Sequence, residues 1–100
     1  MNISIQKSNA TSIVTIDGRI DTLTADSFES QTIPLITEES PNIILNCTSV
    51  DYISSTGLRV FIICDKQAVK YNGTVTIRGL QPFLKEIFDV SGLTDLFTFE

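Results

Sequence analysis

Short β-branched, apolar segments alternate along this chain with segments of helical periodicity, and this alternation limits the possible folds more than any other feature. Strands are predicted at residues 3–7, 12–16, 42–46, 74–78 and 97–99. Helices are predicted in the intervals that follow the second, third and fourth of these strands. The order β-β-α-β-α-β-α-β indicates an α/β fold with a mixed, mostly parallel sheet of about five strands. The first hairpin forms an antiparallel edge, and the helices pack mainly on one face.

The first helix is predicted to begin near a threonine, because Ser and Thr side chains accept hydrogen bonds from free N–H groups at helix starts. Thr22 or Thr24 is the expected cap, and Leu23 and Phe28 are expected on the apolar side of the helix. Pro34 lacks an N–H group and should kink or end the helix.

The second predicted helix, residues 56–71, is long and apolar over more than half of its circumference, so it should pack tightly on the sheet. The pair Asn72 and Gly73 is a typical helix stop. A third helix is predicted to open at Gln81 and Pro82. Its expected buried face consists of Phe83, Ile87 and Phe88.

Composition excludes several classes of function. The chain has 100 residues, the size of one domain, so residues 1–100 are expected to form a single unit. It contains no histidine, which excludes a Ser-His-Asp triad, a Cys-His dyad and most zinc sites. Seven basic and twelve acidic residues give a net charge of −5, which argues against nucleic-acid binding. We therefore expect no enzyme activity, catalytic residue, metal site or cofactor.

Cysteine content and hydropathy predict a cytoplasmic location. The two cysteines, Cys47 and Cys64, are too few for a disulfide framework and are expected to be buried, reduced thiols. The N-terminus lacks a basic segment leading into an apolar run, as a signal peptide would have. The longest apolar run, residues 60–64, is too short to span a membrane.

The segment with the most distinctive chemistry is a row of three hydroxyls, Ser54, Ser55 and Thr56, where a loop becomes the long helix. One interpretation is simple helix capping. The other is a phosphorylation site, because the positive end of a helix dipole favours a phosphate. Gly57 leaves room for another backbone or a nucleotide to approach. Arg59 lies four residues after Ser55 on the same helix face, where it is either a solvated surface residue or a partner for a phosphate.

Three aspartates are further candidates: Asp17, Asp21 and Asp51. Asp21 directly follows a strand and would lie beside the start of the long helix if the two strands are neighbours. It would then orient a serine or bind the metal of an incoming nucleotide. The simpler interpretation is a turn-forming or capping aspartate. The glycines are scattered singly, so the chain has no glycine-rich phosphate loop.

Three segments together resemble the STAS family (sulphate transporter and anti-sigma factor antagonist). Residues 16–21 are similar to its apolar-x-Gly-x-apolar-Asp signature. Residues 42–46 followed by 52–58 resemble its strand, phosphorylation loop and helix, and residues 83–93 resemble its closing helix. The match covers nearly the whole chain in order and spacing, and the last segment makes it specific.

The resemblance implies a domain that acts by binding. In bacterial antagonists of this family, the unphosphorylated domain binds an anti-sigma factor that is also a serine kinase, and the sigma factor is released. Phosphorylation abolishes the binding, and a serine phosphatase restores it. By position, Ser55 would be the phosphorylated residue. Asp21, Ser54, Thr56, Gly57 and Arg59 would lie near the partner or its nucleotide.

One position departs from the family pattern. Many phosphorylated members have Asp before the serine, whereas this chain has Ser54. The change could alter kinase recognition, shift phosphorylation to Ser54 or Thr56, or mark a chain that is never phosphorylated. The alternative function is therefore a constitutive adaptor or accessory subunit of a lipid-transport complex or a stress-sensing assembly.

Overall fold

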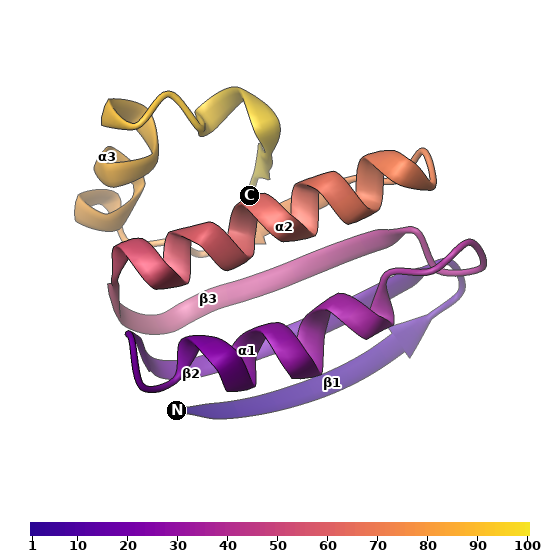
Figure 1. The fold of residues 1–100 in the computed structure, drawn as a ribbon, viewed down its shortest axis with the longest axis horizontal. Coiled ribbons are helices and arrows are strands. Elements are labelled where there is room, and N and C mark those ends of the chain that lie inside the picture. The colour runs from indigo at the N-terminus through magenta and orange to yellow at the C-terminus, as the bar shows by residue number, and fades with distance from the viewer.

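A computed structural model describes residues 1–100 as a five-stranded sheet with three α-helices (Figure 1). The strands are β1 (Asn2–Ser8), β2 (Thr11–Ile20), β3 (Asn42–Ile53), β4 (Val75–Arg78) and β5 (Thr98–Phe99). The α-helices are α1 (Ala25–Thr32), α2 (Ser55–Lys70) and α3 (Pro82–Val90). Two 3₁₀ turns, η1 (Ile33–Leu35) and η2 (Thr94–Leu96), follow α1 and α3.

The strands lie in the sheet in the same order as in the chain, β1-β2-β3-β4-β5. β1 pairs antiparallel with β2, and all other neighbours are parallel. Crossovers of one hand that always move in the same direction place their helices on the same face of a sheet. α1 and α2 accordingly lie side by side in front of the strands (Figure 1). The predicted α/β fold is confirmed.

The core lies between the sheet and the helices and is centred on aromatic residues. Phe61 of α2 makes edge-to-face contacts with Phe28 of α1 and Phe88 of α3, with ring centres 5.3 Å apart in both pairs. Phe97 packs on Phe61 and Phe88 from the segment before β5. Such pairs stabilise a core beyond the area they bury. Phe61 therefore links all three helices to one another.

β2 and β3 are both longer than the pattern predicts. Gly18, two residues beyond the predicted end of the second strand, lies inside β2 with a φ of +110°. The pairing of β2 with β3 shifts register between Thr15 and Asp17 and again between Gly18 and Arg19. Bulges of this kind insert an unpaired residue and interrupt strict alternation of buried side chains. This explains why the second half of β3 does not show as a strand in the sequence.

The start of α1 differs from the prediction. Thr24 occupies the N-cap position, but its side chain makes no capping hydrogen bond to the helix. Leu23, expected on the apolar side, is 91% exposed in the turn before the helix. Pro34 lies in η1, where the α-helix gives way to a 3₁₀ turn, so the predicted break is confirmed.

The buried face of α3 is also different from the one predicted. Leu84 and Phe88, four residues apart, are its buried residues, whereas Phe83 is 58% exposed and Ile87 is half-buried. Helical geometry places residues four apart on one face, so a core position at Phe88 selects Leu84 rather than Phe83. The prediction for Phe83 was wrong, since both residues are apolar and periodicity alone allows either.

The end of α2 confirms the predicted stop. Asn72 adopts a left-handed conformation with a φ of 59°. Its N–H donates to Val69 O, and the N–H of Gly73 donates to Ala68 O. These two bonds form a Schellman motif. None of the three α-helices has the length and apolar character needed to cross a membrane.

Both cysteines are free and buried, as predicted. Cys47 lies on β3 and Cys64 on α2, within the shared core. Burial raises the pKa of each thiol to about 12. A thiol with such a pKa carries almost no thiolate at neutral pH, so both side chains act as small apolar core residues.

Candidate functional site

The row of hydroxyls lies where β2, β3 and α2 meet, at the carboxyl ends of the parallel strands. β3 ends at Ile53, and the N–H of Ser54 donates to Ile20 O at the end of β2, with an N–O distance of 2.8 Å. Because β2 and β3 are neighbours, Asp21 lies at the same edge of the sheet as the start of α2. The predicted proximity of these two segments is confirmed.

Ser54 is the cap of α2. Its hydroxyl accepts a hydrogen bond from the N–H of Gly57 at 3.0 Å, and its carbonyl accepts from the N–H of Leu58 at 2.8 Å. Aspartate is as good a residue as serine at this position. Ser54 therefore performs the local structural role of a capping Asp, without placing a negative charge beside Ser55.

Ser55 differs sharply from its neighbour. It is the first residue of α2, it is exposed, and its hydroxyl makes no hydrogen bond within the chain. The N–H groups in the first turn of a helix lack carbonyl partners in the helix. The Ser55 hydroxyl is thus available at the positive end of a helix of 16 residues.

Gly57 is required by packing within the chain. A Cβ atom at this position would lie 2.7 Å from Ile20 Cγ2 and 2.9 Å from Ile20 O. The close approach expected at this glycine is therefore made by β2 of the same chain. The contact fixes the start of α2 against the end of β2, and with it the position of Ser55 relative to Asp21.

Asp21 shapes the turn that leads from β2 to α1. Its Oδ1 accepts hydrogen bonds from the N–H groups of Leu23 and Thr24 and from the Thr24 hydroxyl. Partial desolvation acts to raise the pKa of Asp21, but these hydrogen bonds outweigh it and the pKa is lowered overall. This supports the turn-forming interpretation of Asp21. The carboxylate also holds the exposed Leu23 at the edge of the sheet that carries Ser55.

Three residues beside Ser55 were not singled out as functional from the sequence: Arg19, Leu23 and Tyr52. The Arg19 guanidinium lies 4.2 Å from the centre of the Tyr52 ring and 3.5 Å from Asp21 Oδ2. Tyr52 is 40% exposed and Leu23 is 91% exposed. An exposed apolar residue, an aromatic ring and a guanidinium are typical of interaction surfaces. In the sequence these residues stand singly, on β2, in the turn that follows it and on β3, and form no local pattern.

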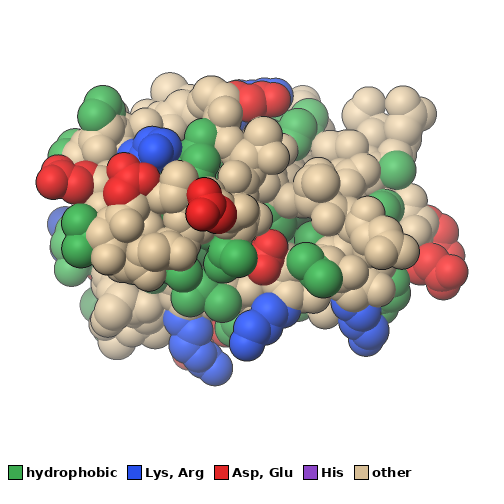
Figure 2. All heavy atoms as spheres, turned by 90° about the horizontal axis from the view of Figure 1, so that it is seen from above, with side chains coloured by type: hydrophobic (Ala, Val, Ile, Leu, Met, Phe, Trp, Pro, Cys, Tyr) green, Lys and Arg blue, Asp and Glu red, His purple; other side chains and the backbone are tan.

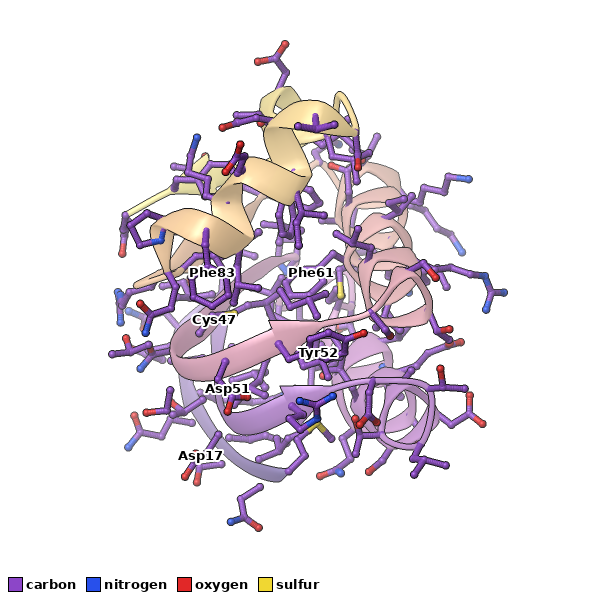
Figure 3. All side chains as sticks on the ribbon, turned by 90° about the vertical axis from the view of Figure 1, so that its left-hand side faces the viewer. Asp17, Cys47, Asp51, Tyr52, Phe61 and Phe83 are labelled. Atoms are coloured by element: carbon purple, nitrogen blue, oxygen red, sulfur yellow. The ribbon has the colours of Figure 1, made fainter.

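The remaining predicted residues fall into two groups. Thr56 and Arg59 lie in the first turns of α2 with Ser55, and Arg59 is exposed and in no ion pair. Asp17 and Asp51 project from the strands on the side away from α1 and α2 (Figure 3). No cluster of three His, Cys, Asp or Glu residues is arranged to hold a metal ion.

Comparison with known proteins gives a consistent result. The model of the STAS domain matches residues 2–100. The anti-sigma-B factor antagonist of Bacillus subtilis (strain 168) is 34% identical over 98 residues, covering 96% of this chain and 89% of the relative.

Solved structures share the fold at much lower identity. SpoIIAA, an anti-sigma factor antagonist, superposes in its unphosphorylated form with a TM-score of 0.80 at 12% identity, covering 99% of this chain and 87% of SpoIIAA. The phosphorylated form of SpoIIAA, a Bacillus cell fate determinant, superposes with a TM-score of 0.78 at 14% identity, covering 99% of this chain and 91% of that structure.

Proposed function

This chain belongs to the STAS domain family, and on that premise we propose that it is an anti-sigma factor antagonist whose partner-binding face is switched by phosphorylation of Ser55. The binding face would be the edge of the sheet where β2 and β3 end. It comprises the turn at Asp21 and Leu23, the side chain of Tyr52, and the first turns of α2 as far as Arg59.

The observation that carries the proposal is the contrast between Ser54 and Ser55. The hydroxyl of Ser54 is committed to the N–H of Gly57, whereas that of Ser55 is exposed and has no partner in the chain. A kinase needs a hydroxyl that it can reach without unfolding the helix start. Ser55 meets this requirement and Ser54 does not, and the Thr56 side chain is half-buried where Ser55 is exposed, so we favour Ser55 as the acceptor over Ser54 and Thr56.

A phosphate on Ser55 would be compatible with the fold and incompatible with a buried interface. The helix dipole stabilises an anion in the first turn by about 0.3–1 kcal/mol. The same dianion at the centre of a contact surface must lose its hydration. The free energy of this desolvation is far larger than the stabilisation by the helix dipole. Phosphorylation would therefore leave the domain folded and release its partner.

The proposed partner is an anti-sigma factor that is also a serine kinase, with a serine phosphatase reversing the modification. Support comes from the Bacillus subtilis relative, which is named for antagonism of an anti-sigma factor. It also comes from SpoIIAA, whose fold this chain shares and whose phosphorylated form has been solved. We propose a cytoplasmic location, because sigma factors act on transcription inside the cell.

The test uses the full chain with the anti-sigma factor kinase of its own cell and ATP. We expect a mass increase of about 80 Da, one phosphoryl group, located on Ser55 by peptide fragmentation. The Ser55→Ala variant should take up no phosphate and should still bind the kinase in titration calorimetry. The Ser55→Glu variant should lose binding.

Two control variants separate the acceptor from the residues around it. Ser54→Ala should still be phosphorylated on Ser55, although the helix start is weakened. Thr56→Val should behave like the native chain. If phosphate appears on Thr56, or if Ser55→Glu binds the kinase as tightly as Ser55→Ala, the proposed switch is wrong. In the second case the constitutive adaptor becomes the better description.

A further inference from the structure

At the far end of α2 from Ser55, the molecule carries a groove that the proposed function does not use. The groove has a volume of about 340 Å³ and lies between the second half of α2, the start of β4, and the segment from η2 into β5. Its lining includes Asp65, Val69, Asp95, Leu96 and Thr98. Asp65 lies ten residues after Ser55, roughly 15 Å further along the helix axis.

The groove exposes apolar surface. Val69 is 62% exposed and Leu96 is 41% exposed, and both are among the few large apolar side chains outside the core. Phe97, almost fully buried, also contributes to the lining. Exposed apolar side chains gathered in one hollow favour contact with another molecule, whereas singly scattered ones do not.

The charge of the groove is acidic and uncompensated. Asp65 and Asp95 both line it, and neither takes part in any of the three ion pairs of the chain. No basic residue lines the groove, and the ammonium of nearby Lys70 lies over the Tyr71 ring. Figure 2 shows the face over α3, η2 and α2, where acidic side chains lie beside apolar ones in the middle and basic ones mainly along the margins.

We propose that this groove binds a short segment of a protein partner that carries a lysine or arginine flanked by aliphatic residues. The cationic group would lie between Asp65 and Asp95, and an aliphatic side chain would cover Val69 and Leu96. The chain would then have two docking sites at opposite ends of α2, and the distal one is independent of phosphate on Ser55.

The test is an NMR titration of the ¹⁵N-labelled full chain with two matched peptides. The probe is acetyl-Ser-Leu-Lys-Leu-Ser-amide, and its control replaces the central lysine with glutamate. We expect the lysine peptide to shift the backbone amides of Val69, Thr74 and Thr98, and the glutamate peptide to leave them unchanged. Equal shifts with both peptides, or shifts only at α3 or near Ser55, would overturn the proposal.

A pair of double variants separates local charge from net charge. Asp65→Asn with Asp95→Asn should weaken binding of the lysine peptide about fivefold at low salt, because two surface charge pairs are lost. Glu38→Gln with Glu39→Gln removes the same total charge from exposed positions outside the groove and should leave the affinity unchanged. Equal weakening by the two double variants would mean that only overall charge matters, which contradicts a specific groove.

The titration is repeated on the Ser55→Glu variant, in which the proposed switch is set to its phosphorylated state. The lysine peptide should bind as tightly as it does to the native chain. This result would hold even if the anti-sigma factor proposal fails, so the two proposals are tested separately. A loss of peptide binding in Ser55→Glu would show that the two ends of α2 are coupled, and the independence stated above would be wrong.

Discussion

The two ends of α2 are both held by a glycine in close contact with the rest of the chain, yet they present very different surfaces. At the start, Gly57 packs against Ile20 of β2, and the surface around it carries the free hydroxyl of Ser55. At the end, a Cβ atom on Gly73 would lie 1.9 Å from Pro41 O, in the segment before β3. The end is thus anchored on the side of β3, which leaves the side facing η2 open as the groove.

The hydrogen bonds of the second half of α2 and of the segment that follows it agree with this one-sided anchoring. Gln67 Nε2 donates to Ile36 O at 3.1 Å, and Asn42 Oδ1 accepts from the N–H of Thr74 at 3.0 Å. Ile36 directly follows η1, and Asn42 is the first residue of β3. A helix held along one flank thus provides a rigid wall for a groove on its other flank.

The substitution with the largest expected effect removes the Phe61 ring, on which the position of both ends of α2 depends. Phe61→Ala should lower the free energy of unfolding by about 3–5 kcal/mol, because a buried aromatic ring between three helices is replaced by a cavity. Kinase binding at one end and peptide binding at the other should weaken together, since both depend on the position of α2. Denaturant unfolding measures the first effect, and a loss below about 1 kcal/mol would contradict the central role of Phe61.

The next effect compares the two glycines directly. Gly73→Ala should cost about 3 kcal/mol of unfolding free energy, since its Cβ would collide with a backbone carbonyl that cannot move aside easily. Gly57→Ala should cost only about 1 kcal/mol, because the gain in helix propensity offsets part of a milder clash. Thermal or denaturant unfolding of the two variants measures the difference. If Gly57→Ala proves the more damaging, the start of α2 is the more tightly packed end.

A smaller effect distinguishes the two serines. Ser54→Ala should lower the free energy of unfolding by about 1 kcal/mol, since the N–H of Gly57 loses its capping acceptor. Ser55→Ala should change it by less than about 0.5 kcal/mol, because its hydroxyl makes no bond in the chain. Denaturant unfolding of both variants under the same conditions provides the measurement. Equal losses would mean that Ser55 also contributes to the cap.

The smallest expected effect is on the free energy of unfolding at acidic pH. Hydrogen bonds from Leu23 and Thr24 lower the pKa of Asp21 below the ordinary value for an aspartate, so the native state favours the ionised carboxylate more than the unfolded chain does. The stability contributed by Asp21 is therefore fully present above that value and is lost as the pH falls through the lower, folded pKa. Asp21→Asn should flatten the dependence of unfolding free energy on pH in this acidic window. An unchanged slope would indicate that Asp21 titrates normally.

The sequence predicted the order of elements and the location of the hydroxyl row, because both depend on local patterns. It did not predict which serine caps α2, because Ser54 and Ser55 are chemically identical and their roles differ by one position in the helix. The extent of β3 was missed because β3 carries one more residue than β2 at each of the two register shifts, and these bulges break its own alternation of buried and exposed side chains. Phe83 was misplaced because the choice between it and Leu84 is made by the core rather than by periodicity.

The groove could not be predicted for a different reason. Its two carboxylates are thirty residues apart in the sequence, on α2 and η2. Only the packing of β5 beside β4 brings them to one place. The role of Gly57 was likewise hidden, since the atoms that it must avoid belong to Ile20. Contacts between distant segments define both features.

The order of the strands in the sheet has a consequence for how this chain folds during synthesis. Each new strand pairs with the strand made just before it, so no strand has to be inserted between two that are already paired. The sheet can therefore grow from β1 outwards as the chain emerges from the ribosome, with each helix closing over it in turn. The last two residues to pair, Thr98 and Phe99, complete the aromatic core and one wall of the groove. The groove would consequently form only after β5 has paired with β4.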